Sequence, residues 1–220
     1  MAAGKIVNLR KLLAERFPQE PLPSGDQLVT GLRGFDEALA GGLTKGAVTE
    51  LSSAAPNAGS ATLIAALLQR AWRDRYFMAL IDGRDSFDLE SVGAPALRHL
   101  LWVRCHEASE AMQAADLLVR DGNFSLVILD LVLNPAAELR KIPQSNWYRL
   151  QRLVEPAPTA FLVLTGESMI SSAQWKLALE NQWTLPQLDC EAADLQTQLK
   201  IRVQRAQLNK WSEREIARAG

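Results

Sequence analysis

The sequence predicts an α/β domain with a mostly parallel sheet and helices on both faces. Short runs of nearly uninterrupted apolar residues alternate with longer segments whose apolar residues recur at helical spacing. Buried parallel strands are continuously apolar because helices cover both sides of the sheet. The 220 residues are 48% hydrophobic and 22% charged, which suits one substantial core.

Composition and cysteine usage narrow the function classes. The formal net charge is -1, so no overall field attracts nucleic acid or an anionic membrane. Cys105 and Cys190 stand apart without the clustered ligands of a zinc site, so we expect no metal and a core role for a buried thiol. No stretch approaches the roughly 20 apolar residues that are needed to cross a bilayer. Charged residues interrupt residues 6–17, so this segment lacks the apolar run of a signal peptide. We therefore expect a cytoplasmic protein.

The first predicted element is an amphipathic helix over residues 5–17, in which basic residues separate apolar residues at helical spacing. Three prolines within residues 18–23 end it. Residues 1–24 are thus predicted to form an N-terminal helical arm and a Pro-rich linker. Such an arm either folds onto its own core or docks on a neighbour, and its candidate contact residues are Leu9, Leu12, Leu13 and Phe17.

A core over residues 25–205 follows the linker. Its helices are predicted at residues 61–73, with Trp72 on the apolar face beside four aliphatic residues, and at residues 108–120. Its strands are predicted at residues 47–51, 76–81, 100–103, 124–129 and 160–164. Ligands bind beyond the carboxyl ends of parallel strands, so we expect the polar residues that follow these strands to share one edge. They are Ser52, Asp82, Asp130 and Thr165.

The loop after the first core strand stands where a phosphate-binding loop of the form G-x-x-x-x-G-K-[ST] is expected. Such a loop binds phosphates because its glycines let N–H groups converge, its lysine neutralises charge and its hydroxyl holds magnesium. Counted from Gly59, the chain has Ala54, Ser60 and Ala61 at the positions of the first glycine, the lysine and the hydroxyl. Asp130 is the one residue that remains of those a nucleotide site would need. We therefore predict an inactive site, no catalytic residue and no ATP cofactor.

Basic residues are concentrated in one part of the sequence, its C-terminal end. Residues 200–220 contain six basic and two acidic residues, which predicts either a solvated surface or a contact for nucleic acid or an acidic partner. Residues 199–203 alternate apolar and basic residues and predict an edge strand. Residues 206–220 are predicted to form a basic C-terminal helix or tail, and the candidate contacts are Arg202, Arg205 and Trp211.

Residues 30–51, TGLRGFDEALAGGLTKGAVTEL, resemble the entry to the RecA-type recombinase core, in which T-G-x-x-x-L-D-x-x-L-G-G-G-L-x-x-G leads into the strand before the phosphate loop. The resemblance extends over about residues 28–205 and implies a RecA-like P-loop NTPase fold. It implies that Asp130 stands at the Walker B position. It places the water-activating carboxylate of an enzyme at Arg84, with Asp85 adjacent.

A RecA-type core with a degenerate phosphate loop and a helical arm is similar to the ImuA family, the SulA-related accessory proteins of bacterial translesion mutasomes. This resemblance implies a non-enzymatic adaptor made in the SOS response to DNA damage. The implied partners are an ImuB-like inactive Y-family polymerase subunit, an error-prone DNA polymerase and RecA itself. Two alternatives remain open: a RecA-type ATPase or recombinase with an atypical phosphate loop, and a SulA-type cell-division inhibitor.

The resemblance also implies two DNA-binding loops, after the fourth and fifth core strands. Residues 131–145 would form the first, with Arg140 and Lys141 as its basic residues. Only GESMIS separates Thr165 from a helical stretch predicted near residue 172, which is too short for a long second loop. We therefore expect DNA contact to be weak. Three tryptophans are predicted to lie on helices or at their ends: Trp147, Trp175 and Trp183.

Overall fold

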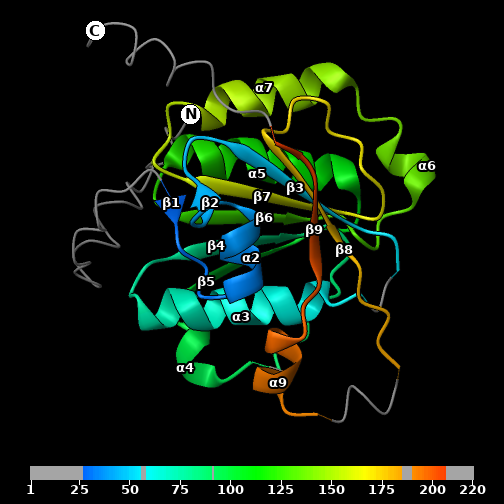
Figure 1. Ribbon diagram of the computed structural model, residues 1–220. Coiled ribbons are helices and arrows are strands. Elements are labelled where there is room, and N and C mark those ends of the chain that lie inside the picture. The colour runs from blue at the N-terminus through cyan, green and yellow to red at the C-terminus, as the bar shows by residue number, and fades with distance from the viewer. Residues whose placement is uncertain (1–26, 56–57, 91, 185–189, 207–220) are drawn as a thin grey trace, which may run out of the picture.

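Within the described residues of the computed structural model (27–55, 58–90, 92–184 and 190–206), seven strands form one sheet in the order β5-β4-β6-β7-β3-β8-β9 (Figure 1). All neighbours pair in parallel except β8 and β9, which are antiparallel. The predicted α/β class with a mostly parallel sheet is confirmed. The strands are β3 (Val48–Ser53), β4 (Met78–Asp82), β5 (Leu100–Arg104), β6 (Leu126–Asp130), β7 (Ala160–Thr165), β8 (Trp175–Leu179) and β9 (Ile201–Ala206).

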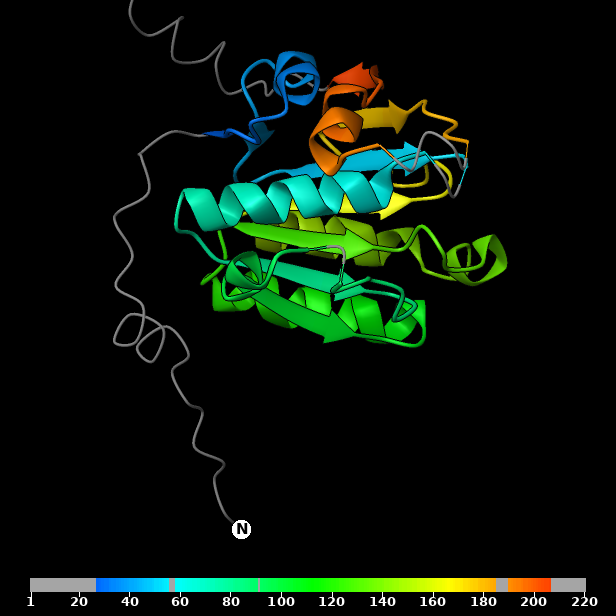
Figure 2. The ribbon, with the colours of Figure 1, turned by 90° about the horizontal axis from the view of Figure 1, so that it is seen from below.

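Helices cover both faces of the sheet, and a separate apolar core lies beneath each layer (Figure 2). One face carries α3 (Ser60–Arg73) with three short helices, α2 (Arg33–Ala38), α4 (Ala94–Leu97) and α9 (Ala192–Thr197). The other face carries α5 (Ala108–Asp121) and α7 (Gln144–Val154), with the short α6 (Ala136–Leu139) between β6 and α7. Strands enclosed in this way are mostly apolar, as the sequence predicted for β4, β6 and β7.

The entry segment is held by one carboxylate. Asp36 accepts hydrogen bonds from the Thr30 N–H at 2.9 Å, the Thr30 hydroxyl at 2.7 Å and the Gly31 N–H at 2.9 Å. These bonds fix the turn before α2, and β1 (Gln27–Leu28) then pairs with β2 (Leu43–Thr44). Gly42 has a φ of 142° and faces the Leu28 carbonyl at a distance that leaves no room for a Cβ. The threonine, aspartate and glycine of this motif are therefore required by the backbone.

Three expectations about tryptophans in the core are wrong. Trp175 lies in strand β8, which was missed, so no helix begins near residue 172; the five residues of β8 have no alternation of buried and exposed positions that would reveal a strand. Trp183 lies in neither a helix nor a strand, although it is buried. Trp72 does not join the apolar face of α3, because its side chain points outward and is 48% exposed. The edge strand was predicted correctly, but β9 extends to Ala206, one residue into the predicted tail.

The predicted N-terminal helix and the tail from residue 207 lie outside the described residues, as do Leu9, Leu12, Leu13, Phe17 and Trp211. Among the helices that are described, none has the length and hydrophobicity needed to cross a bilayer.

Candidate functional site at the carboxyl edge of the sheet

The register of the sheet brings the four predicted polar residues to one edge. Ser52 pairs with Thr165 across β3 and β7, and Asp82 is level with Asp130 across β4 and β6. Ser52 donates a hydrogen bond to the Leu177 carbonyl at 3.1 Å, so its hydroxyl is already used inside the sheet. This edge is where a parallel α/β sheet binds its ligand.

The degenerate phosphate loop leads into α3, as predicted, but its last residues are not open to water. Ala54 is exposed, whereas Ala58 and Ser60 are only 1% and 9% exposed. Gly59 precedes the first turn of α3 with a φ of 102°, a conformation that favours glycine. Ala61, at the place of the metal-binding hydroxyl, is exposed on α3.

Two apolar side chains lie directly on the helix start. A Cβ at Gly59 would stand 2.9 Å from both Cη2 of Trp183 and Cδ2 of Leu199. Trp183 is 6% exposed and Leu199 is 9% exposed, and both belong to the core beneath α3. An indole ring and a leucine provide no countercharge for a phosphate at this place.

Hydrogen bonds hold the chain on either side of Trp183 and Leu199, the two residues that cover Gly59. Asn181 is buried, and its side chain donates to the Gln198 carbonyl at 2.8 Å and accepts from the Lys200 N–H at 2.7 Å. Gln196 donates to Gln69 of α3 at 3.3 Å. The Asn181 bonds join residue 181 to residues 198 and 200, and the Gln196 bond ties this part of the chain to α3. Trp183 and Leu199 lie within these limits and are thereby held against the phosphate-loop position.

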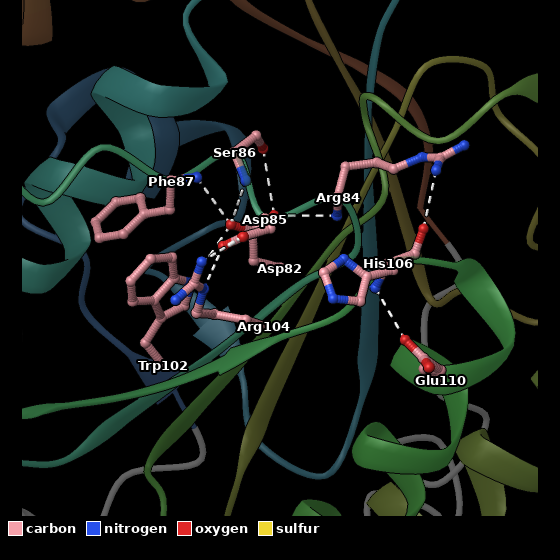
Figure 3. A network of polar contacts seen from close by, with 9 residues as sticks. All are labelled: Asp82, Arg84, Asp85, Ser86, Phe87, Trp102, Arg104, His106 and Glu110. Carbon is pink, nitrogen blue, oxygen red and sulfur yellow. Dashed lines mark hydrogen bonds and ion pairs between the residues drawn. The ribbon is translucent and has the colours of Figure 1, made fainter.

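Asp82 organises the neighbouring loop after β4 (Figure 3). Its carboxylate is buried and accepts from the N–H groups of Arg84, Ser86 and Phe87, at 3.2, 2.7 and 2.8 Å. The Ser86 hydroxyl and the Trp102 indole N–H also donate to it. A carboxylate that accepts from this many donors holds the loop in place, so its role here is structural.

Arg84, which stands at the nominal position of a water-activating carboxylate, is itself held. Its guanidinium donates to the His106 carbonyl at 2.9 Å (Figure 3). It also forms an ion pair with Glu138 at 3.3 Å. The adjacent Asp85 forms a two-pronged ion pair with Arg104, which lowers the pKa of Asp85. Both side chains at this position are engaged in ion pairs, and the one at the nominal place is a cation.

Asp130 lies at the end of β6 and accepts a hydrogen bond from the Val132 N–H at 3.0 Å. The pKa of Asp130 is raised to about 6, mainly by burial; the Val132 hydrogen bond opposes the rise, and the nearby Asp82 adds to it. No described cation pairs with this carboxylate. The Walker B position therefore holds a carboxyl that resists ionisation.

We expect the Asp130→Asn variant to be more stable than the wild type at pH 7.5, by about 1–2 kcal/mol because the carboxyl is only partly buried. The folded pKa of about 6 lies above the ordinary value of 3.8, so between these two pH values the folded state retains its proton and wild-type stability falls as pH rises. The advantage of the variant should shrink at pH 4.5. Urea unfolding at both pH values measures it, and a constant or reversed difference would contradict the pKa assignment.

Glu50 lies in β3, close to the carboxyl edge of the sheet, and the sequence did not reveal its role. It is fully buried in β3, where it accepts from the N–H groups of Met169 at 2.6 Å and Ile170 at 3.0 Å. Ser168 donates to it at 3.0 Å, and Lys176 forms an ion pair with it at 3.1 Å. The turn after β7, where a recombinase has a DNA-binding loop, is thereby fastened to the sheet.

A cleft of about 480 Å³ lies beside this turn, between the phosphate-loop position and β9. The charged residues on its rim form ion pairs. Arg202 pairs with Glu180. Arg140, from the predicted first DNA loop, donates two hydrogen bonds to Glu167, at 3.0 and 3.1 Å. Arg205 is exposed on β9 and has no ion-pair partner among the described residues. Of the predicted basic contacts, Arg140 and Arg202 are thus paired, whereas Lys141 and Arg205 have no ion pair within the part of the chain that the structure describes.

A scan against models of known protein families matches none. Among solved structures, the crystal structure of the RadB recombinase is similar, with a TM-score of 0.55 and 18% sequence identity. The match covers 69% of this chain and 82% of that chain. The chain has a RecA-like fold. At this level of identity the likeness establishes the fold alone.

RecA-like folds imply a nucleotide at the phosphate loop, and the residues of this chain do not fit one. Ser60 supplies no cation where the lysine would stand, and Ala61 supplies no metal ligand. Trp183 and Leu199 pack on the helix start, and Arg84 stands where the resemblance to RecA-type proteins leads one to expect the activating carboxylate. The binding of phosphate and the activation of water each lack their group.

Proposed function

We propose that this chain is a non-catalytic RecA-like accessory protein that serves as an adaptor in DNA repair. The observation that carries the proposal is the packing of Trp183 and Leu199 onto Gly59, at the place where RecA-like enzymes bind phosphate. A catalytic site under selection for ATP would not retain apolar cover, a missing lysine and a cation at the carboxylate position together. The fold then serves as a scaffold for contacts with other proteins.

We place this adaptor in SOS-induced translesion synthesis, in the cytoplasm. The support is the resemblance to the ImuA family and the RecA-like fold, together with the fastened turn after β7, where Glu50 holds Met169 and Ile170. The proposed partners are an ImuB-like inactive polymerase subunit, the error-prone polymerase and RecA. The proposed contacts are the N-terminal arm and the basic C-terminal segment; DNA contact, if made, would be weak and salt-sensitive.

Capture of the polymerase-like subunit tests this proposal. Immobilised full-length protein should retain that subunit from solution, and deletion of residues 1–20 or 206–220 should weaken retention at least about tenfold, a loss of about 1.4 kcal/mol in binding. The Glu37→Ala variant, which removes one exposed ion pair with Arg33, is the matched control. Undiminished capture by both deletions would refute these contact surfaces, and no capture by the full chain would refute the adaptor role.

A further inference from the structure

The last turn of α3 carries a large aromatic side chain at the amino edge of the sheet, where the strands begin. Trp72 points outward from the helix and is 48% exposed. The turn that follows is closed by two main-chain hydrogen bonds. The Arg75 N–H donates to the Trp72 carbonyl at 3.3 Å, and the Tyr76 N–H donates to the Ala71 carbonyl at 3.0 Å. Bonds of this pattern end a helix and hold its last turn, so the backbone that carries the indole is fixed.

The same turn keeps an arginine at a backbone position that favours glycine. Arg75 has a φ of 58°, and its side chain is exposed. Glycine is the usual residue in this conformation just after a helix, because a Cβ is disfavoured there. The backbone of this turn therefore does not account for a cationic residue at position 75.

The end of α4 lies beside this turn (Figure 1). The residue after Arg98 is His99, whose Nδ1 lies 3.1 Å from the Tyr76 carbonyl. The His99 ring also stacks on Phe77, with ring centroids 5.4 Å apart. The end of α3 and the end of α4 thus form one surface. We call it the Trp72 patch, and its exposed or half-buried residues are Trp72, Arg73, Arg75, Pro95, Leu97 and Arg98.

Positive charge on the Trp72 patch is not neutralised within the part of the chain that the structure describes. Arg73 and Arg98 are exposed, and neither forms an ion pair with a described residue. Asp74, the carboxylate of the same turn, is already paired with Arg70 at 2.6 Å. A ligand that complements this surface must therefore bring negative charge of its own.

The composition of the patch favours an acidic protein segment as that ligand. Tryptophan and arginine are enriched in protein interfaces and often supply much of the binding energy. Guanidinium groups bind carboxylates through paired hydrogen bonds, and an indole next to Pro95 and Leu97 offers apolar contact. Single-stranded nucleic acid stacks successive bases on several aromatic side chains along a basic groove, whereas the described patch has one indole.

We propose that the Trp72 patch binds an acidic segment of a partner protein. An apolar side chain of the segment packs on Trp72, and its carboxylates pair with Arg73 and Arg98. The patch lies at the amino edge of the sheet, opposite to the degenerate phosphate loop, so a partner bound here leaves the carboxyl edge free. The inference uses neither of the two terminal segments of the adaptor proposal and does not depend on it.

Peptide selection on the immobilised full-length chain tests the apolar part of this contact. Displayed random peptides of about 12 residues are selected at low salt, and we expect winners with several carboxylates around an aromatic or aliphatic residue. Trp72→Ala should weaken the binding of synthetic winners at least about tenfold, as the loss of a central aromatic contact does. The matched control is Tyr148→Ala, which removes a 46% exposed ring from α7 and should change binding less than about twofold.

Charge reversal tests the electrostatic part. Arg73→Glu and Arg98→Glu should each weaken the binding of the selected peptides at least about tenfold, because attraction is replaced by repulsion. The matched control is Arg152→Glu on α7, since Arg152 is also exposed and has no ion-pair partner among the described residues. This control changes the net charge by the same amount and should bind the peptides nearly as the wild type does.

The indole N–H signals in an NMR spectrum of the full-length chain give a second readout. The signal of Trp72, assigned by its loss in Trp72→Ala, should shift when a selected peptide is added, whereas that of the buried Trp147 should not. Selection of no acidic peptide, equal losses in Trp72→Ala and Tyr148→Ala, or an unshifted Trp72 signal would overturn the proposal. Binding of a thymidine oligonucleotide that Trp72→Ala abolishes would overturn it in favour of nucleic acid. Dimerisation that the same variant abolishes would overturn it in favour of a second copy.

Discussion

Replacement of Glu50 by alanine is expected to destabilise the fold by about 3–5 kcal/mol, the range for breaking a buried ion pair from one side. The variant leaves the ammonium group of Lys176, whose side chain is 15% exposed, without its counterion. It also removes the acceptor of the Met169 and Ile170 N–H groups, at 2.6 and 3.0 Å. Unpaired buried donors retain their desolvation penalty, so the loss exceeds that of one hydrogen bond.

Urea unfolding of Glu50→Ala against the wild type measures this loss. The matched control is Glu37→Ala, whose exposed ion pair with Arg33 should contribute nothing measurable. Removing the stranded cation as well, in Glu50→Ala with Lys176→Met, should recover part of the loss, which a double-mutant cycle detects. A loss below about 1 kcal/mol in the single variant would show that Glu50 does not hold the turn.

Trp183→Ala is expected to cost about 3–5 kcal/mol, as large-to-small changes at buried aromatic residues do. The indole lies on Gly59 and in the core beneath α3, so its loss opens a cavity against the first turn of that helix. Thermal and urea unfolding give the value. In amide exchange, the first turn of α3 should lose protection more than its last turn.

Trp72→Ala is the control for Trp183→Ala, since both remove an indole but Trp72 is 48% exposed against 6% for Trp183. We expect the control to lose no more than about 1 kcal/mol, because about half of its surface is already in water and its removal leaves no enclosed cavity. Equal losses in the two variants would contradict the view that Trp183 is a structural cover.

The fold could be predicted because its determinants are local. The β4, β6 and β7 strands are apolar runs and β3 follows the entry motif, and the parallel register brings the polar residues at their carboxyl ends to one edge. The entry motif was also readable, since Asp36 binds Thr30 and Gly31 within a few residues. Strand β8 was missed because its five residues have neither a clear period nor a turn signal before them.

The state of the candidate site could be predicted only in part. The sequence shows that Ser60 and Ala61 replace the lysine and the hydroxyl residue of the phosphate-loop motif, and that Arg84 stands at the expected place of the carboxylate. The cover is not, because Trp183 is separated from Gly59 by 124 positions in the chain and only tertiary packing brings them together. The same holds for Glu50, whose contacts at residues 168–176 depend on the pairing of β3 with β7 and β8.

The central claim is that this RecA-like core does not use a nucleotide. Calorimetric titration of magnesium-ATP into the full-length chain tests it most directly, with a variant restored at three positions, Ala54→Gly, Ser60→Lys and Ala61→Thr, as a comparison. We predict no saturable binding by the wild type up to about 1 mM, the level at which binding energy falls to about 4 kcal/mol. The restored loop should remain weak while Trp183 covers it. Micromolar affinity in the wild type would contradict the claim.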